Sequence, residues 1–391
     1  MSKRLLKSSR TRKRIGLLLS IAVIIIAGFF LFRAAQFSPF VFQLVFNRNI
    51  NLKTTDSRVN ILLLGIGGGA HEGPNLSDTV IFASIDPAKQ NVTLVSIPRD
   101  LWVPDINGKI NTAYALGEEK KTGSGLPLAE AVVSKITGQQ VDYGVRIDFN
   151  GFIKAVDMME GIDVTVANTF DDYAYPIEGK EDESCGKSPD ELKLLATASA
   201  DLQLEQLPCR YKHIHFDKGT EHMDGQTALE FVRSRHALGV EGSDFARSRR
   251  QAAVISAVKS KVFSVGTLLN PAKVLSLYNI LKDSIDTDIK QDEFDDFIRL
   301  AQKLKNAKIQ STVIDQGDSS QSRLGLLVNP PPTADTGFAW FLAPRIGNGD
   351  FSEIQKYVLC EIQVGNCIVA EKGIATPTPS VAPSLSPSPK K

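Results

Sequence analysis

Arginines gathered between residues 233 and 251 form the part of the sequence best suited to bind an anion. Arg247, Arg250 and Gln251 stand at positions i, i+3 and i+4, which puts them on one face of a helix. The same face continues into an apolar stripe that begins at Val254, so these side chains extend a buried face. Positive charge in the first turns of a helix opposes the helix dipole, whereas the free N–H groups there attract anions. The pattern therefore predicts a site for a phosphate-like group at the start of this helix.

Two more arginines, Arg233 and Arg235, precede that helix. Residues two apart diverge by about 200° in a helix, so these side chains need extended backbone to point the same way. We therefore expect the helix that begins near Gly225 to end there, and Asp244 to cap the next helix and orient an arginine. A single arginine at such a place is commonly solvated and salt-bridged. Four of them on a surface expected to face the core favour the anion site.

Two further segments supply candidate residues for the same site. Arg99 follows Ser96-Ile97-Pro98 at the end of an apolar strand, where proline stops ladder pairing and where α/β folds place ligands. The alternative for Arg99 is a surface ion pair with Asp100. Asp78 begins another strand, and its carboxylate is suited to hold Mg²⁺ on a pyrophosphate, to accept a proton from an attacking hydroxyl, or simply to cap a turn.

Other catalytic and metal motifs are missing from the sequence. The glycines of Gly65-Ile-Gly67-Gly68-Gly69 are not followed by Gly-Lys-Ser/Thr, so the segment is not a P-loop. The chain has neither a Ser-His-Asp nucleophile elbow nor an HExxH motif. The histidines lack the spacing of a zinc site, and we expect His213 and His215, in a polar insertion, to be surface residues. The five histidines are residues 71, 213, 215, 222 and 236.

The elements that must position these residues alternate between strand and helix patterns. Strand patterns cover residues 59–64, 79–85, 92–97, 143–149, 162–166 and, more weakly, 308–314. Helix patterns cover residues 126–137, 150–159, 225–233, 244–262 and, more weakly, 271–283 and 291–305. A turn at Asp86-Pro-Ala-Lys89 predicts a hairpin between the strands on either side of it. Asn150 is expected to cap the helix predicted at residues 150–159. The predicted fold class is α/β, with a mixed central sheet flanked by helices in an α–β–α sandwich.

The N-terminal region differs from this body. Residues 1–14 carry seven basic side chains and no acidic one, and residues 15–32 are an uncharged apolar run. A helix of that length rises about 27 Å, enough to cross a hydrocarbon core. The basic flank predicts a cytoplasmic N-terminus and a main domain outside the cytoplasm, held by one transmembrane helix. A cleaved signal peptide is the alternative, and it too would place the folded body outside.

Charge and cysteine content narrow the possible partners and the compartment. The chain has a net charge of +1 although its first 14 residues are strongly basic, so the main body is mildly acidic and is not a general nucleic-acid binder. An even number of cysteines outside the cytoplasm favours disulfides, although four cysteines allow three connectivities. Local pairing of Cys185 with Cys209 and of Cys360 with Cys367 is the arrangement we prefer. Neither pair has the close spacing of a zinc site.

Taken in order, several pieces of residues 58–262 resemble the LytR-CpsA-Psr family. The pieces are Asn60-Ile-Leu-Leu-Leu-Gly65, Ser77-Asp-Thr79, Ser96-Ile-Pro-Arg-Asp100, Lys109-Ile-Asn-Thr-Ala-Tyr114, Gly161-Ile-Asp-Val164, Met223-Asp-Gly-Gln-Thr-Ala-Leu229 and the arginine segment 233–251. Each piece alone is unspecific, but the ordered set behind an N-terminal anchor is specific.

The resemblance implies an extracytoplasmic phosphotransferase. Such an enzyme attaches a polyprenyl-pyrophosphate-linked glycopolymer to peptidoglycan through a phosphodiester bond, and it needs an apolar tunnel for the lipid. The residues implied to bind the pyrophosphate are Arg99, Arg233, Arg235, Arg247 and Gln251, beside Arg250 from the helix pattern. Asp78 is implied as one of two aspartates that hold Mg²⁺, and Asp244 is implied to support the arginines.

The sequence departs from the family pattern at the metal site. Gly67 stands where the family usually has an aspartate, and Leu76 stands where it usually has an arginine. Glu72 or His71 in the same loop are the candidates to replace the missing carboxylate. Two other functions therefore stay open: a hydrolase of the lipid pyrophosphate, and a non-catalytic surface protein that binds anionic glycolipids.

Composition and the pattern of elements, together with the resemblance, suggest how the chain is divided. Residues 33–57 are expected to be a stalk, and residues 58–265 the catalytic domain, with a polar insertion at 171–215. Residues 266–370 are expected to be a C-terminal lobe or extension. Residues 371–391 are rich in proline, serine and threonine and are expected to be disordered.

Overall fold

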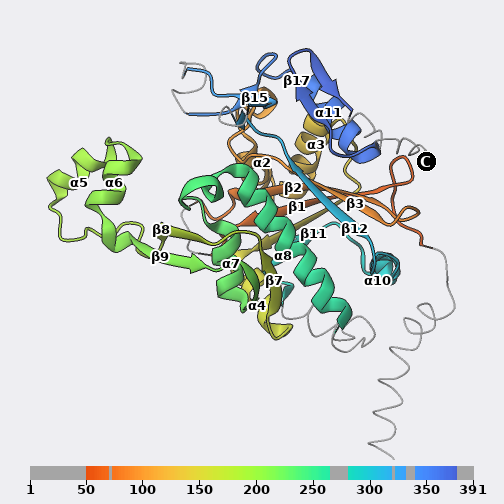
Figure 1. The fold of residues 1–391 in the computed structure, drawn as a ribbon, viewed down its shortest axis with the longest axis horizontal. Coiled ribbons are helices and arrows are strands. Elements are labelled where there is room, and N and C mark those ends of the chain that lie inside the picture. The colour runs from red at the N-terminus through yellow and green to blue at the C-terminus, as the bar shows by residue number, and fades with distance from the viewer. Residues whose placement is uncertain (1–49, 70–72, 265–280, 319–321, 332–339, 377–391) are drawn as a thin grey trace, which may run out of the picture.

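The centre of the molecule is a six-stranded mixed sheet with helices on both faces (Figure 1). The computed structural model describes residues 50–69, 73–264, 281–318, 322–331 and 340–376. Over these residues it confirms the predicted α/β class. The predicted membrane span, most of the stalk and most of the tail lie outside the described residues. Among the helices of the described ranges, none has the length and hydropathy needed to cross a membrane.

The sheet has the strand order β11-β6-β1-β2-β3-β12. Its strands are β1 (Val59–Ile66), β2 (Ser77–Asp86), β3 (Asn91–Ser96), β6 (Tyr143–Asp148), β11 (Ile285–Thr287) and β12 (Lys308–Val313). β1, β2 and β3 are antiparallel neighbours, which confirms the predicted hairpin, and Asp86 Oδ1 accepts hydrogen bonds from two amides of its turn. β6 lies parallel to β1, and β12 lies parallel to β3. Both edge strands come from residues beyond 265, so that part of the chain completes the same sheet.

Both faces of the central strands are buried, and alternate side chains pack on opposite sides. Leu62 and Phe82 belong to a core shared with α2 (Ala113–Lys120), α3 (Gly125–Thr137) and α11 (Ser352–Gln363). Ile81 and Leu94 belong to a core on the other face, which α8 (Asp244–Ser264) and α10 (Phe294–Lys303) help to form. Burial on both sides explains why the sequence of β1 is apolar apart from Asn60.

A third core lies beside the sheet. It is built by α4 (Phe149–Met158), α7 (Gly225–Arg233) and the antiparallel pair of β7 (Ile162–Val166) with β10 (Gly219–Met223). The prediction that Asn150 caps α4 is wrong, because Asp148 is the cap and its Oδ1 accepts a hydrogen bond from Gly151 N at 2.7 Å. The predicted helix at 271–283 lies almost wholly outside the described residues.

The polar insertion forms an arm, defined here as residues 170–216, that projects from the body (Figure 1). Its ribbon consists of β8 (Phe170–Pro176) and β9 (Tyr211–Phe216), and its outer part carries α5 (Pro189–Ala196) and α6 (Ala200–Gln206). A disulfide joins Cys185 to Cys209 within the arm, as the preferred pairing predicted. The inner face of the ribbon packs Phe170 and Phe216 into the third core.

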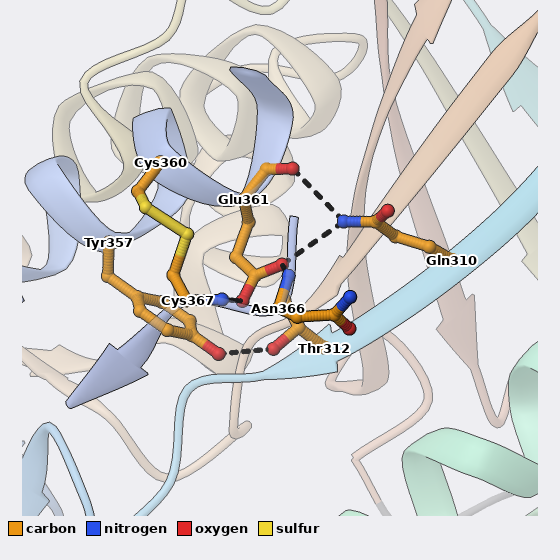
Figure 2. The surroundings of a disulfide bond; sticks show 7 residues. All are labelled: Gln310, Thr312, Tyr357, Cys360, Glu361, Asn366 and Cys367. Atoms are coloured by element: carbon orange, nitrogen blue, oxygen red, sulfur yellow. Dashed lines mark hydrogen bonds between the residues drawn. A yellow bond between two sulfur atoms is a disulfide. The ribbon is translucent and has the colours of Figure 1, made fainter. Parts of the chain in front are cut away.

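The second disulfide, Cys360–Cys367, closes the end of α11 against the edge of the sheet (Figure 2). The carboxylate of Glu361 accepts hydrogen bonds from Cys367 N at 2.8 Å and from Gln310 Nε2, on β12, at 3.1 Å. The disulfide loop is therefore tied to the edge strand that residues beyond 265 contribute.

Four short pairs of antiparallel strands lie outside the central sheet in the described residues. They are β4 (Trp102–Val103) with β5 (Gly108–Lys109), β13 (Gly317–Asp318) with β14 (Arg323–Leu324), β15 (Leu327–Val328) with β16 (Ala343–Pro344), and β17 (Ile368–Ala370) with β18 (Gly373–Ala375).

Candidate functional site

A cavity of about 290 Å³ lies where the central strands, the start of α8 and the arm meet. Six of the residues predicted to form the anion site line it: Asp78, Arg99, Arg233, Arg235, Arg247 and Gln251. They come from four separate segments of the chain, so the fold brings together what the sequence keeps far apart. We call this space the arginine cavity.

Asp78 and Arg99 meet because β2 begins where its antiparallel neighbour β3 ends. Arg99 Nη1 donates a hydrogen bond to Asp78 Oδ1, and each side chain is 31% exposed. Arg99 Nε also lies 3.5 Å from Asp100 Oδ2, while Lys109 Nζ donates to Asp100 Oδ1 at 2.8 Å. The ion pair with Asp100 that the sequence left open is therefore present, but it belongs to a network that reaches into the cavity.

Arg235 carries the clearest electrostatic signal in the cavity. The pKa of its guanidinium is lowered to about 10, chiefly by burial and also by the positive charges of Arg247 and Arg99, against the opposing effect of Asp78. Like charges held together in a poorly solvated place disfavour the charged form. An anion bound among these groups would reverse that effect, so the shifted pKa marks a candidate binding site.

The turn that carries Arg235 is held by Asp172, a fully buried carboxylate of β8. Its Oδ2 accepts hydrogen bonds from Ser234 Oγ at 2.7 Å and from the backbone amides of Arg235 and His236, each at 3.1 Å. α7 ends at Arg233, as predicted, and Asp172 fixes the path of the chain beyond that point. Sequence reasoning missed this residue because it lies about 60 positions before its partners, inside the segment interpreted as a polar insertion.

Gln251 joins α8 to the centre of the sheet. Its Nε2 donates to Thr79 Oγ1 at 3.3 Å, and its Oε1 accepts from Ser96 Oγ at 3.4 Å. The side chain is buried, so these contacts fix the position of the α8 start relative to β2 and β3. Gln251 is thus placed to hold the cavity together as well as to contact whatever occupies it.

An apolar cavity of about 160 Å³ adjoins the arginine cavity. Its lining includes Phe149, Phe152 and Leu229, and it shares Arg233 and Gln251 with the arginine cavity. The guanidinium of Arg233 lies 4.1 Å from the centre of the Phe149 ring, at the junction of the two spaces. A ligand with an anionic head and an apolar tail could therefore occupy both.

Arg250 is a correction to the predicted site, because its side chain is not part of the cavity. Its guanidinium is buried and donates to Phe231 O at 3.0 Å, to Ser234 O at 2.7 Å and to Glu241 Oε2 at 3.1 Å. The prediction that grouped Arg250 with the pyrophosphate ligands overlooked the helical rotation of about 100° between neighbouring residues. That rotation turns Arg250 away from Gln251 and towards the end of α7.

Three other expectations are changed or lie beyond the described structure. Ser243, not Asp244, caps α8, because Ser243 Oγ accepts a hydrogen bond from Ala246 N at 3.2 Å. Asp244 begins α8, but its side chain is outside what the structure describes, so its support of the arginines stays a prediction. Gly67 lines the cavity without supplying a carboxylate. His71 and Glu72 lie outside the described residues.

The arm contributes side chains that the sequence did not assign to the site. Tyr175, Glu181 and Tyr211 all line the arginine cavity. Burial raises the pKa of Tyr175 to about 12, so its phenol keeps its proton at neutral pH. The aromatic residues of this otherwise polar insertion were the only signal in the sequence that the segment packs against the rest of the domain.

The sequence of the chain is similar to those of known proteins. A model of the LytR_cpsA_psr family matches residues 40–326. A polyisoprenyl-teichoic acid–peptidoglycan teichoic acid transferase TagU of Bacillus cereus is 28% identical over 242 residues, which are 61% of this chain and 62% of that protein. The transferase TagV of Bacillus subtilis is 26% identical over 294 residues, which are 71% of this chain and 64% of that protein. The chain thus spans somewhat less than two thirds of these relatives.

Solved structures are similar in fold. The crystal structure of B. subtilis TagV superposes with a TM-score of 0.50 at 23% identity, covering 79% of this chain and 98% of that one. Protein gbs0355 from Streptococcus agalactiae superposes with a TM-score of 0.51 at 21% identity, covering 78% of this chain and 88% of that one. At such identities the likeness supports the architecture and leaves the chemistry to be argued from the residues.

Proposed function

The chain belongs to the LytR-CpsA-Psr family, and from that premise we propose that it is a phosphotransferase that attaches a polyprenyl-pyrophosphate-linked glycopolymer to peptidoglycan through a phosphodiester bond. Two relatives named above are teichoic acid transferases. The observation that carries the proposal is the arginine cavity and its continuity with an apolar cavity. The pyrophosphate would lie among Arg99, Arg235 and Arg247, and the first isoprene units would pack against Phe149 and Leu229.

The proposed reaction moves one phosphoryl-linked glycan. A hydroxyl of peptidoglycan attacks the phosphorus that carries the sugar, and the bond from that phosphorus to the bridging oxygen breaks. Polyprenyl phosphate leaves with the bonding electrons, and the arginines neutralise the negative charge that develops on it. Asp78 is the candidate base for the proton of the attacking hydroxyl, with Arg99 holding its carboxylate in place.

The side chains of the arginine cavity fit Mg²⁺ only in part. Mg²⁺ commonly binds through one or two carboxylates together with substrate phosphates. Asp78 could supply one carboxylate, but it is already paired with Arg99, and Gly67 supplies none. We therefore derive no step of the reaction from the metal.

The proposed location is the cell membrane, with a cytoplasmic N-terminus, a single membrane span and the main domain outside the cytoplasm. The basic and apolar residues at the start of the sequence support this orientation. The two disulfides support an oxidising compartment for the folded part.

The test is glycopolymer transfer by the purified full-length chain in lipid nanodiscs. A lipid-pyrophosphate-linked polymer is supplied as donor and peptidoglycan as acceptor, and the covalently attached polymer is measured. We expect Arg233→Ala and Arg247→Ala each to lower turnover by at least about 100-fold, as loss of a charge-stabilising donor does elsewhere. Wild-type turnover in both variants would refute the assignment of the site.

The same assay separates the two alternative functions. A hydrolase would release free polymer at an undiminished rate when peptidoglycan is withheld. A binding protein would hold the donor tightly at every Mg²⁺ concentration without converting it. Gly67 favours this outcome, because it stands where the family usually has an aspartate.

A further inference from the structure

The outer face of the arm carries a group of metal-ligating side chains that the proposed reaction does not use. Within the part of the chain that the structure describes, the ligand atoms of Asp171, His213 and His215 lie within 4.8 Å of one another. His213 and His215 are two apart on β9, so both point to the same face of the ribbon. Asp171 is the residue of β8 that pairs directly with His215. The antiparallel register therefore brings three ligands to one spot on a disulfide-closed arm.

The three side chains already converge on a common point. Asp171 Oδ1 lies 2.7 Å from His213 Nε2 and 2.8 Å from His215 Nδ1. In a tetrahedral zinc site with bonds of about 2.0–2.1 Å, neighbouring ligand atoms are about 3.3 Å apart. Each of these two distances would have to open by about half an ångström to admit the ion, which side-chain rotation can supply.

Neighbouring residues hold the two imidazoles in the required orientation. Asp217 Oδ1 lies 3.4 Å from His215 Nε2, the ring nitrogen that does not face Asp171. A carboxylate on the far nitrogen is the usual partner of a metal-bound histidine, because it fixes the tautomer and strengthens the ligand. The ring of His213 stacks on Tyr173, with 4.2 Å between centroids and 6° between planes.

We propose that Asp171, His213 and His215 form a binding site for a divalent transition-metal ion, with Zn²⁺ as the expected occupant. Two imidazoles and one carboxylate suit zinc, whereas Mg²⁺ prefers oxygen ligands in an octahedron. The side chains are between 32% and 45% exposed, so the ion can enter from solvent and keep water in a fourth position. This site lies outside the arginine cavity, and neither proposal rests on the other.

The ion would stabilise the ribbon that supports the arginine cavity. Asp171 is followed by Asp172, whose side chain faces inward and holds the turn of Arg235. The backbone carbonyl of Asp171 also accepts a hydrogen bond from Leu238 N at 2.9 Å. Binding on the outer face is therefore expected to raise the melting temperature of the protein by favouring the paired ribbon.

The experiment uses the full-length chain purified without a polyhistidine tag and stripped of metals by a chelator. Titration with ZnCl₂ in a calorimeter should give one ion per chain, and Co²⁺ should give the visible absorption of a tetrahedral nitrogen–oxygen site. His213→Ala and His215→Ala should each weaken Zn²⁺ binding at least 100-fold. Asp217→Asn should weaken it about tenfold, as the loss of an orienting carboxylate does. Zn²⁺ should raise the melting temperature of the wild type and leave that of His213→Ala unchanged.

The matched control is His222→Ala. His222 Nδ1 lies 2.7 Å from Asp163 Oδ1 on another exposed strand pair, which offers one histidine and one carboxylate without the second imidazole. This variant should bind Zn²⁺ as the wild type does. Absence of stoichiometric binding, or equal affinity in the His213→Ala and His215→Ala variants, would overturn the proposal. If an alanine variant fails to fold, Asp171→Asn replaces it in the Zn²⁺ titration, because asparagine keeps the size of the side chain.

Discussion

The arginines at the start of α8 and in the turn after α7 fall into two groups, one that lines the arginine cavity and one that is buried in the structure. Arg247 lines the arginine cavity with Arg235, which comes from the preceding turn. Arg250, one helical turn after Arg247, is buried against Glu241 and the carbonyl groups at the end of α7. The sequence presents both as arginines at helical spacing above an apolar stripe. Only their partners tell a binding residue from a structural one.

The electrostatic surroundings of the two groups explain the difference. Burial lowers the pKa of both Arg235 and Arg250 to about 10. Around Arg250 the strongest charge is that of Glu241, which favours the protonated guanidinium. Around Arg235 the strongest charges are those of Arg247 and Arg99, which disfavour it. A group surrounded by like charges gains from a bound anion, whereas a group already paired with a carboxylate does not.

The largest expected effect is on turnover when a cavity arginine is removed. Arg235→Ala should lower the rate of polymer transfer by about 10³-fold, because a preorganised positive charge is lost at the pyrophosphate. The melting temperature should change little, since the substitution also relieves repulsion from Arg247 and Arg99. Arg249→Ala is the control, because Arg249 pairs with Glu241 on the structural side of α8. Equal losses of turnover in the two variants would abolish the distinction between the groups.

The opposite result is expected for the structural arginine. Arg250→Ala should lower the free energy of unfolding by about 3 kcal/mol, because Glu241 and two carbonyl groups lose a buried partner. Turnover per folded molecule should stay within about tenfold of the wild type, far less than the loss expected for a charge-stabilising group. Urea denaturation followed by circular dichroism gives the first quantity, and an assay at low temperature gives the second. A stable Arg250→Ala protein that fails to turn over would return Arg250 to the binding site.

Local patterns predicted the fold well where neighbouring residues decide the structure. The largely apolar run of β1, the Asp86 turn and the periodicity of α3, α7 and α8 each predicted elements close to those observed. The prediction was weaker where distant segments meet. β11 has only three residues and β12 is largely polar, so both carry little strand signal, and they pair with β6 and β3 at the two edges of the sheet.

The candidate site shows the same division. The cavity arginines could be identified because several charged residues lie close together in the sequence. Asp172 could not, because nothing local distinguishes it from the exposed aspartates of a polar insertion, yet it is fully buried. Nor could the grouping of Asp171 with His213 and His215, which depends on the register of two strands about 40 residues apart. The helix cap at Asn150 failed for a smaller reason, since Asp148 offers an equally good cap two residues earlier.

A smaller effect is expected when the support of the cavity arginines is weakened without removing them. Asp172→Asn keeps the shape of the side chain but loses the charge that accepts three hydrogen bonds from the turn of Arg235. The ratio kcat/KM for the donor should fall by about 10- to 100-fold, mainly through a higher KM, because the guanidinium is held less firmly. Residues that act as one unit are not additive. The double variant Asp172→Asn/Arg235→Ala should therefore be no slower than Arg235→Ala alone; a further large loss would show that Asp172 acts independently.

The smallest expected effect is a change of donor affinity with pH that is specific to the cavity arginine. The donor pyrophosphate requires the protonated guanidinium of Arg235, and burial together with the neighbouring arginines lowers the pKa of that group to about 10, well below its ordinary value. Affinity should accordingly be unaffected below pH 9 and fall as pH rises through about 10. One unit above its pKa a group is about 90% deprotonated, so the donor should bind up to about tenfold more weakly at pH 11 than at pH 9.

The change in affinity is measured by the fluorescence of a labelled donor, with circular dichroism to verify that the protein stays folded. Arg235→Ala should bind weakly at both pH values with a flatter dependence, and an equally steep fall in that variant would assign the titration to another group. Arg250 shares the lowered pKa but pairs with Glu241 away from the cavity, so it would act on binding only through the fold.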